Sequence, residues 1–420
     1  MRLSIHIFSG LLCGFLATSL WAETPTVKDT AAIATAPYKS GEPSAFSWHA
    51  YGTLNYQNFD WQTDPTKHAL LDLERVAVEP SYRYSDHIRM DGEIEFEHGG
   101  TGASMELDKF DESGDFETEI EKGGDVDIEE LNISFLINPA FNIRVGHFFV
   151  PIGFACVLDE PDDYYTVTRS EAENAIIPVE WDETGIEVNG ETSLLHYQLQ
   201  LINGLDAAGF SSQYWIAGGH QGSFEGVNAD DMAVAGRLET SALPHILLGI
   251  SGYFGNSSDN RPKPDLRVPA YVGILSAHAQ FTTDVFTLRG LGIWGHLSHA
   301  NAVSLANASL PDNLNEPRTP VASQAYAAFV EAGLNLSQLP PLRSLIPNQS
   351  MILFGRVDSY NTMLRSNHTD PKEARFTMSG GLNYSPVPLL IFKGEYSHRT
   401  LNIPARDIEN TFSLGIGFVI

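Results

Sequence analysis

The chain has 420 residues, with 25 lysines and arginines against 53 aspartates and glutamates, and a formal net charge of −28 at pH 7. This acidity argues against nucleic-acid binding, which relies on a basic face. Of its two cysteines, Cys13 lies in the N-terminal segment described next and Cys156 lies far from it, so a framework of disulfides is excluded.

The first residues have the features of a secretory signal peptide. Arg2 gives a basic tip, an apolar run extends from Ile5 to Leu20, and Ala22 precedes an acidic start at Glu23. This order predicts export and removal of residues 1–22. Residues 23–45 are rich in Thr, Ala, Pro and Lys without periodicity, and we expect a flexible periplasmic lead-in.

No later run of about 18 apolar residues predicts a transmembrane helix. The exported chain is therefore expected in the periplasm, in the medium, or as a β-barrel in the outer membrane of a Gram-negative cell. The remaining length suits either two soluble domains or one large barrel.

From Phe46 onward the dominant pattern has a period of two residues. In the segment 88–97, Ile88, Met90, Ile94 and Phe96 alternate with polar and charged residues. A strand separates these two sets onto opposite faces, whereas a helix would mix them. The same separation recurs in segments 130–137, 196–201, 390–399 and 412–420.

The pattern predicts roughly sixteen strands of about ten residues, the length of tilted membrane strands. Candidate strands begin near residues 46, 69, 86, 127, 141, 184, 194, 213, 232, 245, 270, 284, 323, 350, 373, 387 and 410. Their number is odd, whereas bacterial barrels normally use an even number, so one strand is wrong or missed. The weakest candidate is the glycine-rich piece around Tyr214 to Gly222.

Connections of two kinds separate the predicted strands. Those at residues 138–140, 240–244 and 385–388 are short, whereas 99–124, 159–179, 256–269 and 297–320 are long and polar. Short turns at one end and long loops at the other are typical of an outer-membrane barrel, which we predict over residues 46–420. The alternative is an exported β-sandwich or a two-domain sugar-binding protein, which would also alternate.

Several segments resemble the phosphate-selective porin O/P family of outer-membrane porins. Residues 141–153, Phe-Asn-Ile-Arg-Val-Gly-His-Phe-Phe-Val-Pro-Ile-Gly, are similar to the strand of that family that ends in a Val-Pro-Ile/Phe-Gly turn. Residues 173–186, 354–360, 381–386 and 412–418 resemble its following segment, its late strands and its closing strand. The similarity covers about half of the predicted mature chain, in patches.

The resemblance implies a sixteen-stranded barrel, a homotrimer and passive transport of small solutes. As an outer-membrane barrel, the chain is expected to contact membrane lipid, and a divalent-cation site in the acidic segment 106–130 could bridge to lipopolysaccharide phosphates. The ladder of Lys and Arg that the best-known members use for anions does not map onto this acidic chain, and the closing strand ends in Ile420 rather than an aromatic residue. From the acidic balance we expect a weak preference for cations.

Alternation predicts which ionisable residues face a water-filled lumen. Charges of both signs around such a pore would orient dipolar solutes and screen ions, although each residue could instead belong to an ion-pair network of the wall. The predicted pore-lining residues are Arg89, Asp91, Glu93, Glu95, Arg144, Arg356, Asp358, Lys393, Glu395 and Arg399.

A long acidic segment follows the turn at Pro151 to Gly153. It contains Asp159, Glu160, Asp162 and Asp163. The segment is long enough to fold into a barrel as a constriction loop, and an outward loop is the open alternative.

A second acidic segment, residues 106–130, contains twelve carboxylates against two lysines. Such a density of oxygen ligands suits Ca²⁺ or Mg²⁺, and it predicts a candidate site for Ca²⁺ at Asp111, Asp115, Asp125 and Asp127 in an external loop. The plainer alternative, which the composition favours, is a solvated acidic loop. No cofactor is expected to be required.

Sequence motifs of an enzyme are missing. The chain has no Gly-x-Ser-x-Gly, no His-Glu-x-x-His and no phosphate-binding glycine loop. We therefore expect a porin-like passive channel rather than an enzyme. The alternatives are a closed barrel that serves as an adhesin, receptor or structural protein, and an outer-membrane hydrolase assembled from distant loop residues.

Overall fold

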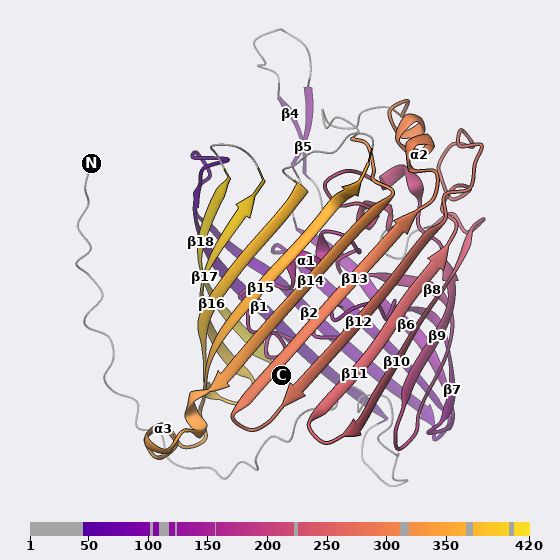
Figure 1. The fold of residues 1–420 in the computed structure, drawn as a ribbon. Coiled ribbons are helices and arrows are strands. Elements are labelled where there is room, and N and C mark those ends of the chain that lie inside the picture. Colours follow the sequence, from indigo (N-terminus) through magenta and orange to yellow (C-terminus); the bar gives the residue numbers. More distant parts are fainter. Residues whose placement is uncertain are drawn as a thin grey trace.

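The computed structural model describes residues 45–100, 104–108, 117–121, 124–155, 157–221, 226–310, 319–366, 373–402 and 407–420. Over this part of the chain, 16 antiparallel strands form one closed barrel (Figure 1). The barrel strands are β1 (Phe46–Trp61), β2 (Leu70–Ser85), β3 (Ile88–Glu97), β6 (Asp125–Asn138), β7 (Phe141–Phe149), β8 (Asp182–Glu191), β9 (His196–Asn203), β10 (Met232–Leu243), β11 (Ile246–Gly255), β12 (Val272–Thr282), β13 (Phe286–Leu297), β14 (Gln324–Asn335), β15 (Ser350–Arg365), β16 (Ala374–Val387), β17 (Leu390–Leu401) and β18 (Ile408–Val419).

The remaining elements lie in the connections. They are the hairpin of β4 (Ser104–Asp108) and β5 (Glu117–Glu121), the helices α1 (Glu171–Asn174), α2 (Ala300–Asn307) and α3 (Pro340–Leu345), and the short 3₁₀ turns η2 (Ala207–Gly209), η3 (Ala217–Gly219) and η4 (Leu336–Gln338). No helix among the described residues is both long and apolar enough to cross a bilayer.

The barrel closes where β1 meets β18. Beside the strand ladder, the Ala50 amide donates to the Ile420 carbonyl at 3.2 Å and the Ile420 amide donates to the Ala50 carbonyl at 2.7 Å. Closure leaves no sheet edge unpaired, which a sheet surrounded by lipid requires. The predicted all-β barrel is therefore confirmed.

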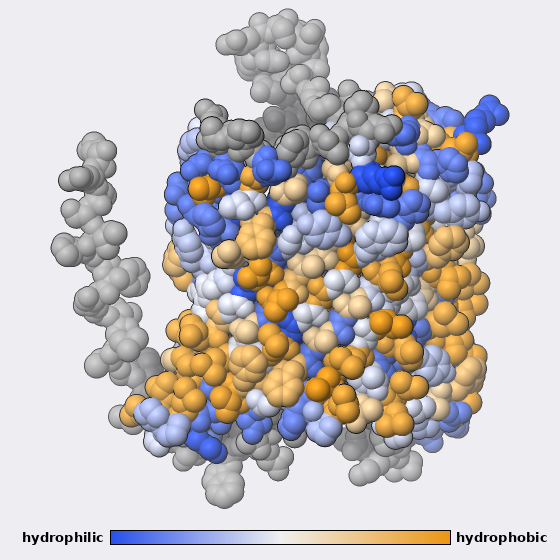
Figure 2. Space-filling view, in the orientation of Figure 1, coloured by the Kyte–Doolittle hydropathy of each residue, from blue (hydrophilic) through white to orange (hydrophobic). Residues whose placement is uncertain are grey.

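The outer wall is apolar because the strands alternate. On β18, the exposed fractions of Phe412, Leu414 and Ile416 are 46%, 46% and 38%, whereas the intervening Ser413 is buried on the inner face. Hydrophobic residues spread over the middle and lower parts of the wall, and hydrophilic residues gather toward the upper rim (Figure 2). A soluble β-sandwich would bury these apolar side chains, so this alternative is wrong.

The two ends of the barrel differ as predicted. The C-terminal end of the chain and the short turns 86–87, 139–140, 244–245 and 388–389 lie at one end, and β4, β5 and α2 lie at the other (Figure 1). One longer connection at the short-turn end, residues 336–349, carries η4 and α3. The expected signal peptide 1–22 and all but the last residue of the expected lead-in 23–45 lie outside the described residues, and β1 begins at Phe46.

The strand predicted near residue 213 is wrong. This segment instead forms an isolated bridge between Ser211 and Trp215, followed by η3. Trp215 is fully buried with a positive φ of 44°, and its indole nitrogen donates to the Ala322 carbonyl at 2.9 Å. The apolar residues that suggested a strand therefore pack inside the barrel, and the number of barrel strands is even.

The barrel interior contains an apolar core. The segment between β7 and β8 (150–181) and the segment between β9 and β10 (204–231) bury apolar side chains against the inner faces of the strands. The largest of these are Ile152, Phe154, Ile176, Ile177, Trp181, Leu205, Phe210, Trp215 and Ile216, and Phe148 of β7 belongs to the same cluster. Alternation alone predicts a water-filled interior, but these segments occupy part of it.

Candidate functional site

The segment 150–181, which we call the inner segment, begins with a turn held by the wall. Gly153 has a φ of +70°, a conformation that glycine adopts without steric cost. Its amide donates to Ser251 Oγ of β11 at 3.3 Å, and its carbonyl accepts from Arg237 of β10 at 2.5 Å. These bonds bring the segment inside the barrel immediately after β7.

Strands elsewhere on the wall hold the middle of the inner segment. Lys393 Nζ of β17 donates to the carbonyls of Tyr164 and Thr166, each at 2.8 Å. Glu395, which also lies on β17, accepts a hydrogen bond from the Val167 amide at 2.7 Å. The segment thus extends from β10 and β11 to β17 through the interior.

Inward-facing glycines make room for the inner segment. A Cβ atom added to Gly417 of β18 would lie 2.5 Å from the Cβ atom of Pro161, and one added to Gly333 of β14 would lie 2.4 Å from the Tyr165 ring. Both distances are too short for a side chain, so the segment packs directly on the backbone of the wall.

The acidic residues predicted for a constriction loop have different surroundings. Asp159 forms ion pairs with Arg75 and Arg169 at 2.7 and 3.0 Å, and Glu160 lies 3.3 Å from His49. Asp162 is exposed, and the Asp163 carbonyl accepts from Arg289 of β13 at 2.7 Å. Burial opposes the charge of Asp159, but the two guanidinium groups outweigh it and lower its pKa.

The predicted pore-lining residues divide into two groups. Arg356, Asp358, Glu395 and Arg399 line a cavity described below. The others contact residues of the wall or of the inner segment. Arg89 pairs with Asp91 at 2.7 Å, and Arg144 pairs with Glu130 and Glu187 at 3.4 and 2.9 Å. Glu93 accepts a hydrogen bond from Tyr51 at 2.7 Å, Glu95 pairs with Arg75 at 3.1 Å, and Lys393 donates to the carbonyls of Tyr164 and Thr166.

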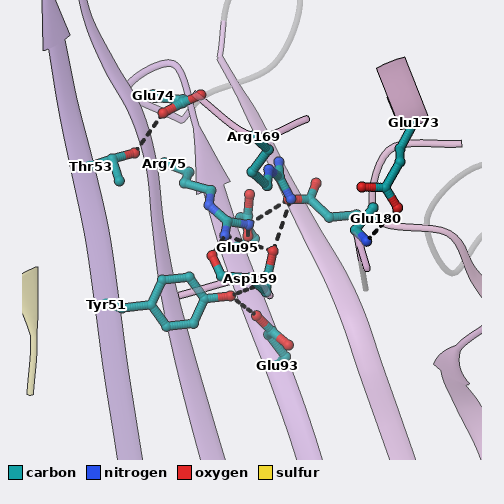
Figure 3. A network of polar contacts seen from close by, with 11 residues as sticks. Tyr51, Thr53, Glu74, Arg75, Glu93, Glu95, Asp159, Arg169, Glu173 and Glu180 are labelled. Atoms are coloured by element: carbon teal, nitrogen blue, oxygen red, sulfur yellow. Dashed lines mark hydrogen bonds and ion pairs between the residues drawn. The ribbon is translucent and has the colours of Figure 1, made fainter. Parts of the chain in front are cut away.

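A network of charges joins the inner segment to β1, β2 and β3 (Figure 3). Arg75 is its centre, with 1% of its side chain exposed, and its guanidinium binds Glu95, Asp159 and Glu180. Arg169 binds Asp159 and Glu180 from the other side. The network fixes Glu180, whose φ of 49° is unusual for a residue other than glycine.

Two β-bulges place additional charged side chains on the inner face of the barrel wall. The ladder of β1 and β2 shifts register opposite Glu74, so Glu74 and Arg75 both contact groups on the inner face. The ladder of β3 and β6 shifts at Glu129, and Glu129 and Glu130 both lie inside. An extra residue of this kind brings two successive side chains to one face.

Sequence reasoning missed Arg75, Arg169, Glu171 and Glu180. For Arg75 a signal was present, since the apolar period in β2 changes phase between Leu73 and Val76, as a bulge requires. No local pattern distinguishes Arg169, Glu171 and Glu180, because their partners come from distant strands.

A cavity of about 320 Å³ remains between the inner segment and the wall of β1 and β15 to β18. The inner segment contributes Arg169, Ser170 and Glu171. Apart from Leu70 of β2, the rest of the lining is polar or aromatic and includes Gln57, Phe59, Trp61, Lys67, Arg356, Asp358, Thr377, Ser379, Glu395, Ser397, Arg399, Thr411 and Ser413. Four cationic and three anionic side chains therefore surround this space.

Some of these charges hold the cavity in shape. Arg399 of β17 forms ion pairs with Glu171 of α1 and with Glu409 of β18, the latter at 2.6 Å. Arg356 of β15 donates to Ser170 at 2.5 Å and pairs with Asp358 at 2.8 Å. Lys67 instead lies over the Trp61 ring, 3.7 Å from its centroid, and remains exposed.

A histidine cluster lies near the start of β8. His147 and His220 both contact Asp182, His220 at 2.9 Å. Burial disfavours the charged imidazole, but the hydrogen bond and charge of Asp182 outweigh it and raise the pKa of His220 to about 9.

Of the four residues predicted for a metal site, the structure describes two. Asp111 and Asp115 lie outside the described residues. Asp125 and Asp127 belong to β6, where they pair in register with Glu97 and Glu95 of β3.

The comparisons with known proteins agree with this architecture. No family model matches the chain. An uncharacterized protein of Aquifex aeolicus (strain VF5) is 25% identical over 352 residues, which are 82% of this chain and 74% of that protein.

Several solved structures share the fold at low sequence identity. The outer membrane channel DcaP of Acinetobacter baumannii is 10% identical, with a TM-score of 0.54 over 92% of this chain and 100% of that one. OmpT of Vibrio cholerae is 7% identical, with a TM-score of 0.51 over 90% and 99%. Salmonella typhi OmpF, in a complex with daunomycin, is 9% identical, with a TM-score of 0.51 over 89% and 97%. The protein thus has the fold of a porin-type barrel and is located in the outer membrane.

Proposed function

We propose that the protein is a passive channel for small hydrophilic solutes. The observation that carries this proposal is the polar cavity between the inner segment and the wall of β15 to β18 and β1. Four cations and three anions line it, so dipolar or zwitterionic solutes are favoured over strongly charged ones. The acidity of the whole chain adds a weak preference for cations.

The finer features expected from the sequence belong to the same proposal. Residues 1–22 act as the signal peptide and residues 23–45 as a periplasmic lead-in, and three copies assemble in contact with lipid and lipopolysaccharide. Membership in the phosphate-selective porin O/P family is supported by the segment 141–153, whose turn at Gly153 starts the inner segment. A selectivity for phosphate is not proposed, because acidic residues surround Arg75 and Arg169.

Conductance in planar bilayers tests the channel directly. We expect open single-channel currents from folded protein, and a reversal potential close to zero with a small cation preference. A shift in gel mobility on boiling would first show that the sample is a closed, detergent-resistant barrel. Folded protein that gives no current would overturn the proposal in favour of a closed barrel that acts as a receptor, adhesin or structural protein.

A matched pair of tryptophan variants tests the route. Ser379 of β16 lines the cavity, whereas its neighbour Met378 faces outward with 52% of its side chain exposed. We expect Ser379→Trp to lower the conductance by roughly half or more, because the indole fills the narrow space. Met378→Trp adds the same group on the lipid side and should leave the conductance unchanged. Equal conductance in both variants would show that solutes pass elsewhere.

A further inference from the structure

Three residue pairs on one face of the ladder between β3 and β6 each consist of two acidic residues. In the ladder, Glu93 is opposite Glu130, Glu95 is opposite Asp127, and Glu97 is opposite Asp125. Like charges directly opposite each other on one face of a sheet destabilise it. This arrangement therefore needs compensation from positive charge.

Arginine side chains neutralise some of the acidic residues of β3 and β6. Glu130 pairs with Arg144, and Glu95 shares Arg75 with Asp159 and Glu180. Arg169 is likewise shared between Asp159 and Glu180. Each of these two guanidinium groups thus binds at least two carboxylates, so each positive charge is shared among several acidic residues.

Oxygen atoms of three carboxylates converge at this end. One ligand atom from each of Glu95, Glu97 and Glu180 lies within 4.8 Å of the others, and Glu95 and Glu180 are buried. Glu180 reaches the site from the inner segment, whereas Glu95 and Glu97 belong to β3. Figure 3 shows Glu95 and Glu180 near the Arg75 guanidinium, which binds both of them.

Buried oxygen atoms without a hydrogen-bond partner provide an independent observation. Among the described residues, Glu95 Oε1 and Glu129 Oε2 are such atoms, although the two side chains are only 1% and 7% exposed. A buried carboxylate oxygen without a partner is costly, and a bound cation would satisfy it.

We propose that Glu95, Glu97 and Glu180 bind a hard divalent cation of the Ca²⁺ class, with Asp125 and Asp127 beside them. Such cations take six to eight oxygen ligands, which carboxylates and water supply here. The ion would link the inner segment to β3 and neutralise the acidic pairs. This site lies on the barrel wall rather than in the external loop, and it does not depend on the protein being a channel.

Terbium provides a direct probe of this site. Trp181 follows Glu180 in the chain, so its indole can sensitise the luminescence of Tb³⁺ bound there. Refolded full-length protein in detergent, free of lipopolysaccharide, should show saturable Tb³⁺ luminescence that Ca²⁺ displaces. Wild-type protein without saturable binding of either ion would overturn the proposal.

Two variants test the ligands. Glu97→Gln and Asp125→Asn each remove one carboxylate at the partly exposed end of the site, and we expect each to weaken Ca²⁺ binding at least about tenfold. Asp86→Asn removes an exposed carboxylate at the short-turn end and should bind as the wild type does. The shift in gel mobility on boiling confirms that each variant is folded.

The remaining outcomes would contradict the proposal. If both variants bind Ca²⁺ as tightly as Asp86→Asn, Glu97 and Asp125 do not form the site. If binding is lost only in a double variant of Asp111→Asn and Asp115→Asn, the ion binds at those two residues instead. Conductance is not used in either comparison, so failure here leaves the proposed channel untouched.

Discussion

Lys393 Nζ donates a hydrogen bond of 2.8 Å to the carbonyl of Tyr164, 229 residues away in the chain. Sequence alternation correctly places Lys393 on the inner face of β17, but this ammonium group is buried and binds the backbone of the inner segment. Lys393, which the sequence predicts to line the pore, therefore holds the inner segment in place.

Replacement of Lys393 should therefore release the inner segment. Lys393→Met leaves the carbonyls of Tyr164 and Thr166 without their donor, and each unsatisfied buried carbonyl costs about 1–3 kcal/mol. We expect a lower temperature of the gel-mobility shift and noisier single-channel currents. Lys263→Met removes the same charge from an exposed side chain outside the cavity and serves as the control. Equal stability of the two variants would argue against the anchoring role.

The close approach of Pro161 to Gly417 predicts sensitivity to a single methyl group. Gly417→Ala should destabilise the barrel by about 1–3 kcal/mol, because the added Cβ atom overlaps Pro161. Gly355 of β15 faces outward, with no atom within 4 Å of an added Cβ, so Gly355→Ala should be neutral or slightly stabilising. Urea unfolding in detergent measures both. A neutral Gly417→Ala would mean that the inner segment does not pack on β18.

Stability should depend on pH through His220. Its pKa is raised to about 9 in the folded protein, above about 6.5 in the unfolded chain. The stabilisation is therefore complete below about pH 6.5 and is lost as the pH rises through about 9, by up to about 3 kcal/mol in total. Unfolding midpoints at pH 6, 7.5 and 9.5 measure this loss. His220→Gln should flatten the profile in this range, and an unchanged profile would show that another group is responsible.

Charge at the cavity should control selectivity. Lys67 lines the cavity and is exposed, so Lys67→Glu should raise the permeability ratio of cations over anions by roughly twofold or more. Lys263→Glu makes the same change on an exposed loop between β11 and β12 and should have little effect at physiological salt. Reversal potentials in a salt gradient distinguish the two. The same shift in both variants would mean that overall charge, rather than the cavity, sets selectivity.

The sequence by itself determined the barrel, an approximate number of strands and most of the residues that face inward. The physical reason is local, since a period of two separates the outward Phe412, Leu414 and Ile416 from the inward Ser413, whatever the rest of the chain does. The phase changes at Glu74 and Glu129 were also present in the sequence as signals of bulges.

Tertiary structure alone decided how the interior is used. Arg399 meets Glu171, Lys393 meets Tyr164, and Glu180 meets Glu95 only because the inner segment crosses a closed barrel. Such contacts join residues that are far apart in the chain, and no local periodicity encodes them. An inward-facing charge can therefore line the cavity, as at Arg399, or anchor a segment, as at Lys393, and only its partners distinguish the two.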